Sequence, residues 1–518
     1  MTETPRRTRR ATRRLAAPVA LAAAFVVAAC GGGGGDTGEP LQPPLDDTYR
    51  PTGKAAAGDV FVHLFEWRWS DIARECETFL GPAGYAGVQI SPPSEHAVID
   101  RAASGAPYPW WQRYQTVSYR LENSRSGTLP EFTDMVQRCK ASGVAIYADA
   151  VINHMTAGAG VGSAGSPYTK YQYPAAGWQQ ASFHPTCSIQ SYDDARQVQQ
   201  CELVGLADLR TDEAGVRDRL AAYLIELHRL GVAGFRVDAA KHMHPRDIDA
   251  IVARVDAAAL AEGRPRPYVF LEVINNPGEA VTAEQFFGVG YASGGASDVT
   301  DFLYGYRVTD AFLGRGGATL ASLRQLTDDL LPADKSVVFV DNHDNQRGDN
   351  LYYASTVGGT PVYELAAMFM LAHPHGAPSV MSSYGFDRAT QAGRDRGPPS
   401  AAGGVTTSTF DELGRSRCTT ELGSAQAGQW ICEHRRLGIA QMVTFREVTA
   451  GAPLVGFTTL GDDQRIAFAR DGRGFFALNR STGASFTLTT TLPDGLYCNV
   501  ARDDYRPATA TRAAQCGG

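Results

Sequence analysis

Three acidic residues lie at or near the ends of short apolar runs, where they have the chemistry for acid–base or nucleophilic catalysis. They are Asp238, Glu272 and Asp344. Acidic side chains on otherwise apolar strands are costly to bury unless they are paired or used. Two carboxyl groups that flank one bond are the usual equipment of glycoside hydrolysis: one attacks or activates water, and the other protonates the leaving oxygen. Three converging acids, with histidines and an arginine beside them, make a purely structural role the weaker interpretation.

The run Val232–Asp238 holds the most specific pair. Residues two apart on a strand point to the same side, so Arg236 and Asp238 project together. A guanidinium beside a carboxylate is expected to lower its pKa and keep it ionised, as a carboxylate nucleophile requires. On this stretch alone a structural ion pair is an equally good interpretation, and the other two acids favour the chemical one.

The elements that must position these acids begin at Val60, where strand-like apolar runs alternate with amphipathic helical segments. Continuous apolar strands separated by helices indicate parallel strands with both faces covered. Eight such units over roughly 380 residues predict an α/β protein with a (β/α)8 TIM barrel, in which function collects at the carboxyl ends of the strands. The expected strand runs are 60–65, 86–91, 144–151, 232–238, 268–274, 300–304, 337–341 and 379–383.

Two regions depart from this alternation. Residues 155–207, between the third and fourth strands, carry Gly, Tyr, Pro and two cysteines, which predicts a small inserted domain B. After residue 446, strand-like runs at 453–458, 464–470, 474–478 and 485–490 follow without helices, which predicts a C-terminal all-β sandwich. The expected domains are therefore the catalytic barrel at 58–154 and 208–445, the insert at 155–207 and the β domain at 446–518.

The first thirty residues have the features of an export signal. A basic segment precedes an uncharged apolar run, Leu15 to Ala29, which is short for a bilayer span and suits a signal peptide. The run ends Ala28-Ala29-Cys30-Gly31, which resembles a bacterial lipobox and predicts a lipid on Cys30, with ordinary cleavage nearby as the alternative. Paired arginines leave both Sec and twin-arginine export open. Residues 31–57 are rich in Gly, Pro and Thr, which predicts a flexible linker.

Charge and cysteine content narrow the class further. The 518-residue chain has a formal net charge of −7 although its N-terminus is basic, so an acidic body argues against nucleic acid or anionic lipid as a partner. Of nine cysteines, the eight other than Cys30 form an even set, which predicts disulfides in an exported chain. Eight cysteines allow 105 connectivities. Nearest-neighbour pairing is expected: Cys76–Cys139, Cys187–Cys201, Cys418–Cys432 and Cys498–Cys516.

An aromatic cluster, Tyr108-Pro109-Trp110-Trp111-Gln112-Arg113-Tyr114, follows the second expected strand. Tryptophan and tyrosine combine a large apolar face with a polar group, which suits stacking against sugar rings. Core aromatics would be expected on a periodic element, whereas this segment contains proline and has no period. The cluster therefore predicts a platform for a sugar.

Several stretches closely resemble α-amylases of glycoside hydrolase family 13, in the same order from about residue 58 onward. They are FVHLFEWRW (61–69), GVQISPP (87–93), 110–119, DAVINHM (149–155), 234–242, 272–274, FVDNHDNQRG (339–348) and MSSY (381–384). The resemblance implies endo-hydrolysis of α-1,4-glucosidic bonds in starch, glycogen and related glucans, with retention of configuration by double displacement. A transglycosylating or maltooligosaccharide-forming relative is the alternative, and a non-catalytic glucan-binding surface lipoprotein is a distant one.

The resemblance also implies a role for individual residues. Asp238 matches the family's nucleophile, Glu272 its general acid/base, and Asp344 the third carboxylate, which holds sugar hydroxyls. The implied substrate-binding residues are Trp110, Trp111, Tyr114, His154, Arg236, Lys241, His242 and His343. The enzyme is expected to be an exported monomer, extracellular or at the cell surface, that meets a membrane only through a lipid on Cys30.

The family's structural calcium implies a further set of ligands. Its positions map to the side chains of Asn153 and Asp208 and to the backbone carbonyls of Gln199 and His242. All four are oxygen donors, as calcium prefers.

Chloride is where the sequence departs from the subgroup that it most resembles, whose members often bind this anion. Arg236 and Asn342 match two of the chloride ligands, but the third, a basic residue in those relatives, is Ser379 here. A cation lost beside an anion site weakens anion binding. The sequence therefore predicts activity that does not depend on chloride.

Overall fold

The computed structural model describes residues 42–45, 48–50, 60–419, 426–495, 497–502, 505–506 and 515–516. The expected signal peptide with Cys30, and most of the expected linker, lie outside these residues. The described residues belong to one compact unit, which begins at Thr37. None of the helices described in it is both long and apolar enough to cross a membrane.

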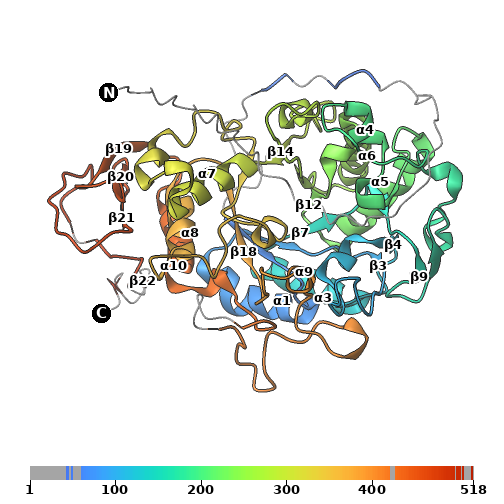
Figure 1. The fold of residues 1–518 in the computed structure, drawn as a ribbon, viewed down its shortest axis with the longest axis horizontal. Helices are drawn as coiled ribbons and strands as arrows, with labels where there is room; N and C mark the ends of the chain where they lie inside the picture. The colour runs from blue at the N-terminus through green and yellow to red at the C-terminus, as the bar shows by residue number, and fades with distance from the viewer. Residues whose placement is uncertain are drawn as a thin grey trace, which may run out of the picture. The chain divides into compact units, whose positions relative to one another are not determined.

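Eight parallel strands close into a barrel, which confirms the predicted fold class (Figure 1). Going round the barrel, each strand pairs with the next in sequence order, and the last pairs with the first. The strands are β1 (Phe61–Leu64), β2 (Gly87–Ile90), β7 (Ala145–Ala150), β12 (Gly234–Val237), β13 (Tyr268–Leu271), β14 (Ser297–Thr300), β15 (Ser336–Val338) and β18 (Ala377–Ser382). In this register Arg236 of β12 lies level with Asp149 of β7 and Phe270 of β13.

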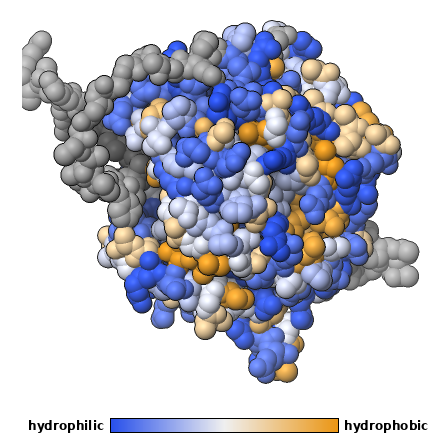
Figure 2. Space-filling view, turned by 90° about the vertical axis from the view of Figure 1, so that its right-hand side faces the viewer, coloured by the Kyte–Doolittle hydropathy of each residue, from blue (hydrophilic) through white to orange (hydrophobic). Residues whose placement is uncertain are grey.

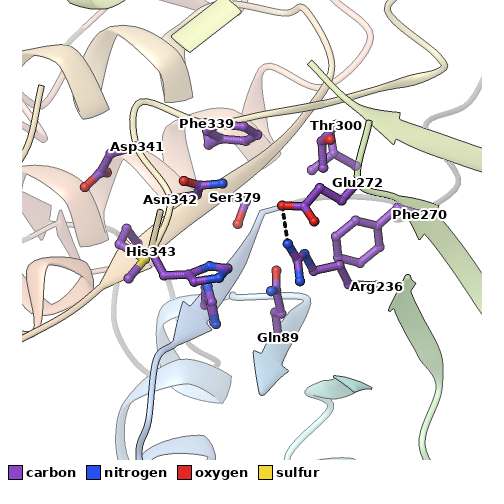
Figure 3. Close-up of a pocket in the computed structure, with 13 residues that line it drawn as sticks. Gln89, Arg236, Phe270, Glu272, Thr300, Phe339, Asp341, Asn342, His343 and Ser379 are labelled. Atoms are coloured by element: carbon purple, nitrogen blue, oxygen red, sulfur yellow. Dashed lines mark ion pairs between the residues drawn. The ribbon is translucent and has the colours of Figure 1, made fainter. Parts of the chain in front are cut away.

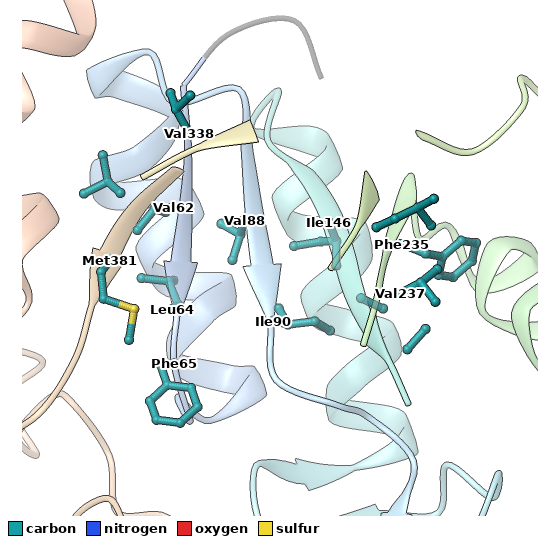
Figure 4. Close-up of a cluster of buried hydrophobic side chains, with 14 of the residues drawn as sticks. Val62, Leu64, Phe65, Val88, Ile90, Ile146, Phe235, Val237, Val338 and Met381 are labelled. Atoms are coloured by element: carbon teal, nitrogen blue, oxygen red, sulfur yellow. The ribbon is translucent and has the colours of Figure 1, made fainter. Parts of the chain in front are cut away.

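Side chains alternate between the two faces of each strand, as the period of two requires. On β1, Val62 and Leu64 belong to the large buried cluster that includes residues of the helices (Figure 4). Phe61 belongs to a separate cluster with Tyr147 and Phe270. Such layers of side chains fill the interior of a (β/α)8 barrel. Each fully buried side chain of this size stabilises the fold by about 1.5–3 kcal/mol.

The helices that follow the strands carry local start and stop signals. Helix α3 begins with a capping box between Thr128 and Glu131, and α5 ends at Gly231, whose φ of 109° suits glycine. Hydrophilic residues cover most of the face on which α5 and α6 lie, with apolar ones scattered among them (Figure 2). The main helices are α1 (Trp69–Glu75), α3 (Leu129–Ala141), α5 (Ala214–Leu230), α6 (Pro245–Ala261), α7 (Phe302–Leu313), α8 (Tyr363–Ala372) and α10 (Leu437–Val448).

The sixth strand was predicted at 300–304, and this placement is wrong. Strand β14 ends at Thr300, and α7 begins two residues later. Asp301 lies between them and accepts a hydrogen bond from the backbone N–H of Tyr304 at 3.2 Å. An aspartate cap of this kind satisfies a free N–H at a helix start. The aromatic residues that suggested a strand therefore belong to the first turn of a buried helix.

Between β7 and β12 the chain forms a segment of short elements: β8 (His154–Met155), β9 (Ala159–Val161), β10 (Pro167–Thr169), α4 (Ala195–Gln200) and β11 (Ala207–Asp208). Strands β8 and β11 pair antiparallel, so the start and end of the segment lie side by side. The bond Cys187–Cys201 closes it, and the other three expected disulfides are also present. The nearest-neighbour prediction is confirmed at all four bonds.

The C-terminal region differs from its prediction. Helix α10 runs through residue 446, and a three-stranded antiparallel sheet follows: β19 (Leu454–Thr459), β20 (Arg465–Arg470) and β21 (Gly474–Asn479). The strand expected at 485–490 is not formed, and Phe486 within it is 44% exposed. Its alternating pattern has no facing surface that would bury it. Among the described residues, this sheet and the two-residue pair β22–β23 stand in place of the expected sandwich.

Candidate active site

Arg236 is the centre of the site, because its guanidinium contacts three carboxyl groups. Its Nη1 lies 2.6 Å from Asp149 Oδ1 and 2.8 Å from Asp238 Oδ1. Its Nη2 lies 2.5 Å from Glu272 Oε1 (Figure 3). All four side chains are buried. The expected pair is therefore a cluster in which one cation serves three acids.

A backbone feature places the Glu272 carboxyl group. Ala239, directly after Asp238, has a φ of 49°, a conformation that is uncommon for residues other than glycine. Its N–H donates a 2.8 Å hydrogen bond to Glu272 Oε2. Glu272 is thus held by a backbone N–H on one oxygen and by Arg236 on the other, and a strained backbone at such a point is typical of functional sites.

The electrostatics differ from the prediction made for Asp238. Burial raises the pKa of Asp238 although Arg236 opposes it, so the expected lowering is wrong. The physical reason is that the loss of hydration on burial outweighs the attraction of the guanidinium. Burial also raises the pKa of Glu272, again against Arg236 and with repulsion from Asp238 adding to the rise.

Two further acids belong to the same cluster. Burial raises the pKa of Asp149 to about 7, and neighbouring carboxylates add to the shift. Desolvation at the mouth of the site and repulsion from Glu272 raise the pKa of Asp344 to about 7 as well, although its side chain is 44% exposed. Four carboxyl groups near one guanidinium cannot all ionise readily, so the cluster retains protons close to neutral pH and titrates as a unit. Such a cluster can hold one acid protonated, as a general acid requires.

The two expected histidines face the same mouth as neutral rings. His343 is stacked on Tyr114 with ring centroids 4.9 Å apart and an interplanar angle of 5°. A ring nitrogen of His154, Nε2, lies 3.0 Å from the carbonyl oxygen of Tyr114. Burial lowers the pKa of His154 to about 4 and that of His343 well below its usual value. Neutral imidazoles can hydrogen-bond sugar hydroxyls without adding charge.

The aromatic segment is a short 3-10 helix, Trp110–Tyr114, instead of a loop. Trp110 and Trp111 are half-buried, and the indole N–H of Trp110 donates to the Arg394 carbonyl at 3.0 Å. Tyr114 is buried and its hydroxyl donates to Asp149 Oδ2 at 3.0 Å. Trp110 and Trp111 thus keep the exposure that a sugar platform requires, whereas Tyr114 packs within the site.

Lys241 and His242 lie in the turn after β12, and the protein uses both side chains internally. Lys241 Nζ donates to the Ile274 carbonyl at 2.5 Å and forms an ion pair with Glu279. A ring nitrogen of His242, Nδ1, lies 2.9 Å from the Val198 carbonyl. Sequence reasoning missed Glu279 because nothing in its local pattern distinguishes it, and it assigned no role to Asp149, although that residue ends an expected strand.

The expected calcium ligands lie in two pairs, one at the β8–β11 pairing and one between α4 and the turn after β12. Asp208 is opposite His154 in the β8–β11 pair and is hydrogen-bonded to the side chain of Asn153. Its Oδ2 lies 2.7 Å from His184 Nδ1. Asp208 Oδ1 is buried and accepts no hydrogen bond. Helix α4, which carries Gln199, packs on the turn that contains His242. A buried carboxylate oxygen without a donor, next to an amide and carbonyls, fits a hard cation.

In the described part of the chain, no three side chains from histidine, cysteine, aspartate and glutamate are grouped to hold a metal ion. The expected calcium site is not a group of that kind, because its ligands are one carboxylate, one side-chain amide and two backbone carbonyls.

A cavity of about 20 Å³ lies below Glu272, with room for about one water molecule. Its lining includes the three residues matched to the chloride site, Arg236, Asn342 and Ser379 (Figure 3). The side-chain oxygen of Asn342 accepts from the N–H groups of Asp344 and Asn345. Ser379 presents a neutral hydroxyl to this cavity. Arg236 is therefore the only side chain in the lining of the cavity that carries a permanent positive charge.

Comparison with known proteins agrees with this geometry. The family model described as "Alpha amylase, catalytic domain" matches residues 90–308. The chain is 45% identical over 455 residues to an alpha-amylase of Thermomonospora curvata, covering 86% of this chain and 68% of that protein. It is 42% identical to an alpha-amylase of Tribolium castaneum, covering 86% of each chain.

Among solved structures, a mutant of alpha-amylase I from Eisenia fetida in complex with maltohexaose superposes with a TM-score of 0.77. The two chains are 36% identical, and the match covers 92% of this chain and 93% of that one. A (β/α)8 barrel with a shared carboxyl cluster at its mouth, together with these relatives, defines a glycoside hydrolase. Within that class, the chain belongs to the alpha-amylase family.

Proposed function

We propose that this chain cleaves internal α-1,4-glucosidic bonds of starch-type glucans with retention, using Asp238 as nucleophile, Glu272 as general acid/base and Asp344 as the third carboxylate. The observation that carries this proposal is the contact of one guanidinium with both Asp238 and Glu272. Both carboxyl groups therefore belong to one buried cluster, as the paired acids of a glycoside hydrolase must. Retention itself is proposed from the alpha-amylase family to which the chain belongs.

The reaction then proceeds in two displacements. Asp238 attacks the anomeric carbon while the protonated carboxyl of Glu272 gives its proton to the leaving glycosidic oxygen. Glu272, now ionised, takes a proton from water, whose oxygen attacks the same carbon and frees Asp238. His154, His343 and Asp344 hold the hydroxyls of the sugar that is cleaved.

Digestion of soluble starch tests the proposal. The first products should carry the α configuration at the new reducing end by NMR, and viscosity should fall before much reducing sugar accumulates. Initial β products would contradict retention. Products longer than a defined maltooligosaccharide substrate would instead favour the transglycosylating alternative.

Calcium is proposed as a structural ion at Asn153, Asp208, Gln199 and His242, where it would tie the inserted segment to the barrel. Treatment with EDTA should lower Tm by several degrees and added Ca²⁺ should restore it, because a ligand present at about 1,000 times its Kd stabilises by about 4 kcal/mol. Asp208→Asn should abolish this response.

Asp212→Asn is the control for the calcium test. Asp212 lies 3.4 Å from His184, the same imidazole that contacts Asp208. This variant should keep the full response to Ca²⁺. A Tm of the unmodified enzyme that EDTA leaves unchanged would disprove the site.

Activity is expected to be independent of chloride, because Ser379 leaves the cavity without a second permanent cation and Arg236 pairs directly with Glu272. Dialysed enzyme should hydrolyse starch at the same rate in sodium chloride and in sodium gluconate of equal ionic strength. Ser379→Lys should introduce a response to chloride, whereas Ser379→Ala should not. Strong activation of the unmodified enzyme by chloride would sink this proposal.

The four disulfides indicate an oxidising compartment outside the cytoplasm. We further propose export with a lipid on Cys30, supported by the lipobox-like residues Ala28 to Gly31. The mass of the mature N-terminus decides between a lipidated cysteine and its removal.

A further inference from the structure

Arg347 is a buried cation to which the mechanism above assigns no role. It ends the short 3-10 helix Asn345–Arg347 that follows Asp344, and it is 5% exposed. Among the described residues, no carboxylate lies within ion-pair distance of its guanidinium. Burying an arginine without such a partner is costly, so its other contacts must hold it.

Those contacts are three acceptors on three different segments. Arg347 Nη1 donates to the carbonyl of His343, Nε donates to the Arg394 carbonyl at 3.0 Å, and Nη2 donates to the hydroxyl of Tyr384 at 2.9 Å. The fork geometry of a guanidinium lets it bond several fixed acceptors at once, which a lysine ammonium cannot reproduce.

Aromatic rings surround the same guanidinium. The guanidinium carbon, Arg347 Cζ, lies 4.6 Å from the ring centroid of Phe386, 4.8 Å from that of Trp110 and 5.4 Å from that of Phe65. A desolvated cation at such distances is attracted to the ring faces by about 2 kcal/mol or more. These contacts explain how the charge is tolerated.

Two of the contacts lead directly to the proposed glucan cleft. The Arg394 carbonyl that accepts from Arg347 also accepts from the indole N–H of Trp110, so one oxygen links the guanidinium to the sugar platform. The His343 carbonyl belongs to the residue whose ring is stacked between Tyr114 and Phe65.

We propose that Arg347 is a positioning residue that fixes Trp110 and the His343–Asp344 segment in one arrangement for glucan binding. This inference rests on the proposed function of that cleft. The guanidinium of Arg347 holds the backbone at His343, the residue before Asp344. The Arg394 carbonyl, which accepts from both Arg347 and Trp110, fixes the orientation of the indole ring. A substitution far from the reacting atoms that displaces them by about 1 Å lowers the rate by about 100-fold.

The test compares Arg347→Met, which removes charge and fork, with Arg347→Lys, which keeps the charge alone. Both are assayed at a temperature at which circular dichroism shows them folded. For Arg347→Met, kcat/KM on maltohexaose should fall by about 10- to 100-fold. In the inactive Glu272→Gln background, the same replacement should raise the Kd for maltohexaose about tenfold, because the platform is no longer held.

The pH profile separates positioning from a merely structural role. Desolvation and the neighbouring acids raise the pKa of Asp344 to about 7, and the charge of Arg347 opposes part of this rise. Arg347→Met should therefore move the acid limb of kcat/KM to higher pH, whereas Arg347→Lys should leave the limb near its wild-type position but still raise KM. Among the described residues, the charged or titratable groups that interact with Asp344 are Tyr114, Arg236, Asp238, Glu272, Tyr306, His343 and Arg347.

Arg388→Met is the matched control. Arg388 also covers an aromatic ring, that of Tyr352 at 4.1 Å, and donates to the Gly348 carbonyl. Within the described residues, its guanidinium makes no hydrogen bond to Trp110, His343 or Asp344. Its kcat/KM should stay within twofold of wild type. An unchanged Kd and an unchanged acid limb in Arg347→Met would overturn the inference while wild-type starch hydrolysis still stands. A wild-type enzyme that fails to cleave starch would overturn the proposed function instead.

Discussion

Replacing Glu272 with glutamine is expected to lower kcat for starch hydrolysis by about 10³- to 10⁴-fold while maltohexaose still binds. Glutamine keeps the size of the side chain and can still accept from the Ala239 N–H. It has no proton to give to the glycosidic oxygen, and loss of general acid–base catalysis costs about 10²–10⁴. Single-turnover assays on a maltooligosaccharide with an ordinary sugar leaving group measure this loss.

Glu284→Gln is the matched control for this prediction. Glu284 is exposed on the 3-10 turn Ala283–Phe286, in the same connection between β13 and β14. Glu284→Gln should retain wild-type kcat. Activity of Glu272→Gln within tenfold of wild type would refute the assignment, since no neighbouring acid shares its backbone N–H contact.

The largest effect on stability is expected from Glu75→Gln. Glu75 ends α1 and is fully buried; its Oε1 lies 2.8 Å from His434 Nε2 and 2.6 Å from Arg435 Nε. Removing one partner of a buried charge network costs about 3–5 kcal/mol, because the remaining cation stays without its counter-charge. Thermal unfolding should show a Tm lower by about 3–5 °C, because a chain of this length unfolds with an entropy of about 1 kcal/mol/K.

The stabilisation by Glu75 is expected to depend on pH in one direction. Burial raises the pKa of Glu75, but the hydrogen bonds from His434 and Arg435 outweigh burial, and the pKa is lowered overall. A carboxyl whose pKa is depressed by folding stabilises above its unfolded pKa, about 4.3, and loses that stabilisation as the pH falls through its folded value. The Tm difference between wild type and variant should therefore be full near neutral pH and shrink in acid.

Glu77→Gln is the matched control, two residues further along the chain. Glu77 pairs with Arg138 at 2.6 Å, but the two side chains are 40% and 34% exposed. Exposed ion pairs contribute about 0–1 kcal/mol, so this variant should unfold close to wild type. Equal losses for Glu75→Gln and Glu77→Gln would show that burial of the network does not matter.

Local patterns were sufficient for much of the architecture. Five of the eight barrel strands lie wholly within their predicted runs and two more, β15 and β18, overlap them, because a buried parallel strand is a short apolar run bounded by turns. The sixth was misplaced because Phe302 and Tyr304 suit a strand and a buried helix equally, and the Asp301 cap decides between them. The run 485–490 has the right alternation, yet it pairs with no strand in the described part of the chain, and Phe486 stays 44% exposed beside Arg465.

What the sequence by itself determined is the order of the elements and the acids at the strand ends, since each depends on residues close together in the chain or on a known family pattern. The tertiary structure alone decided how charge is shared and how deeply it is buried. Asp149, Asp238 and Glu272 contact one guanidinium, and burial raises the pKa of Asp238 although this neighbour lowers it. Glu279 beside Lys241 and Arg347 below Trp110 likewise depend on segments far apart in sequence. Burial and Coulomb interaction act through space, so no local pattern contains them.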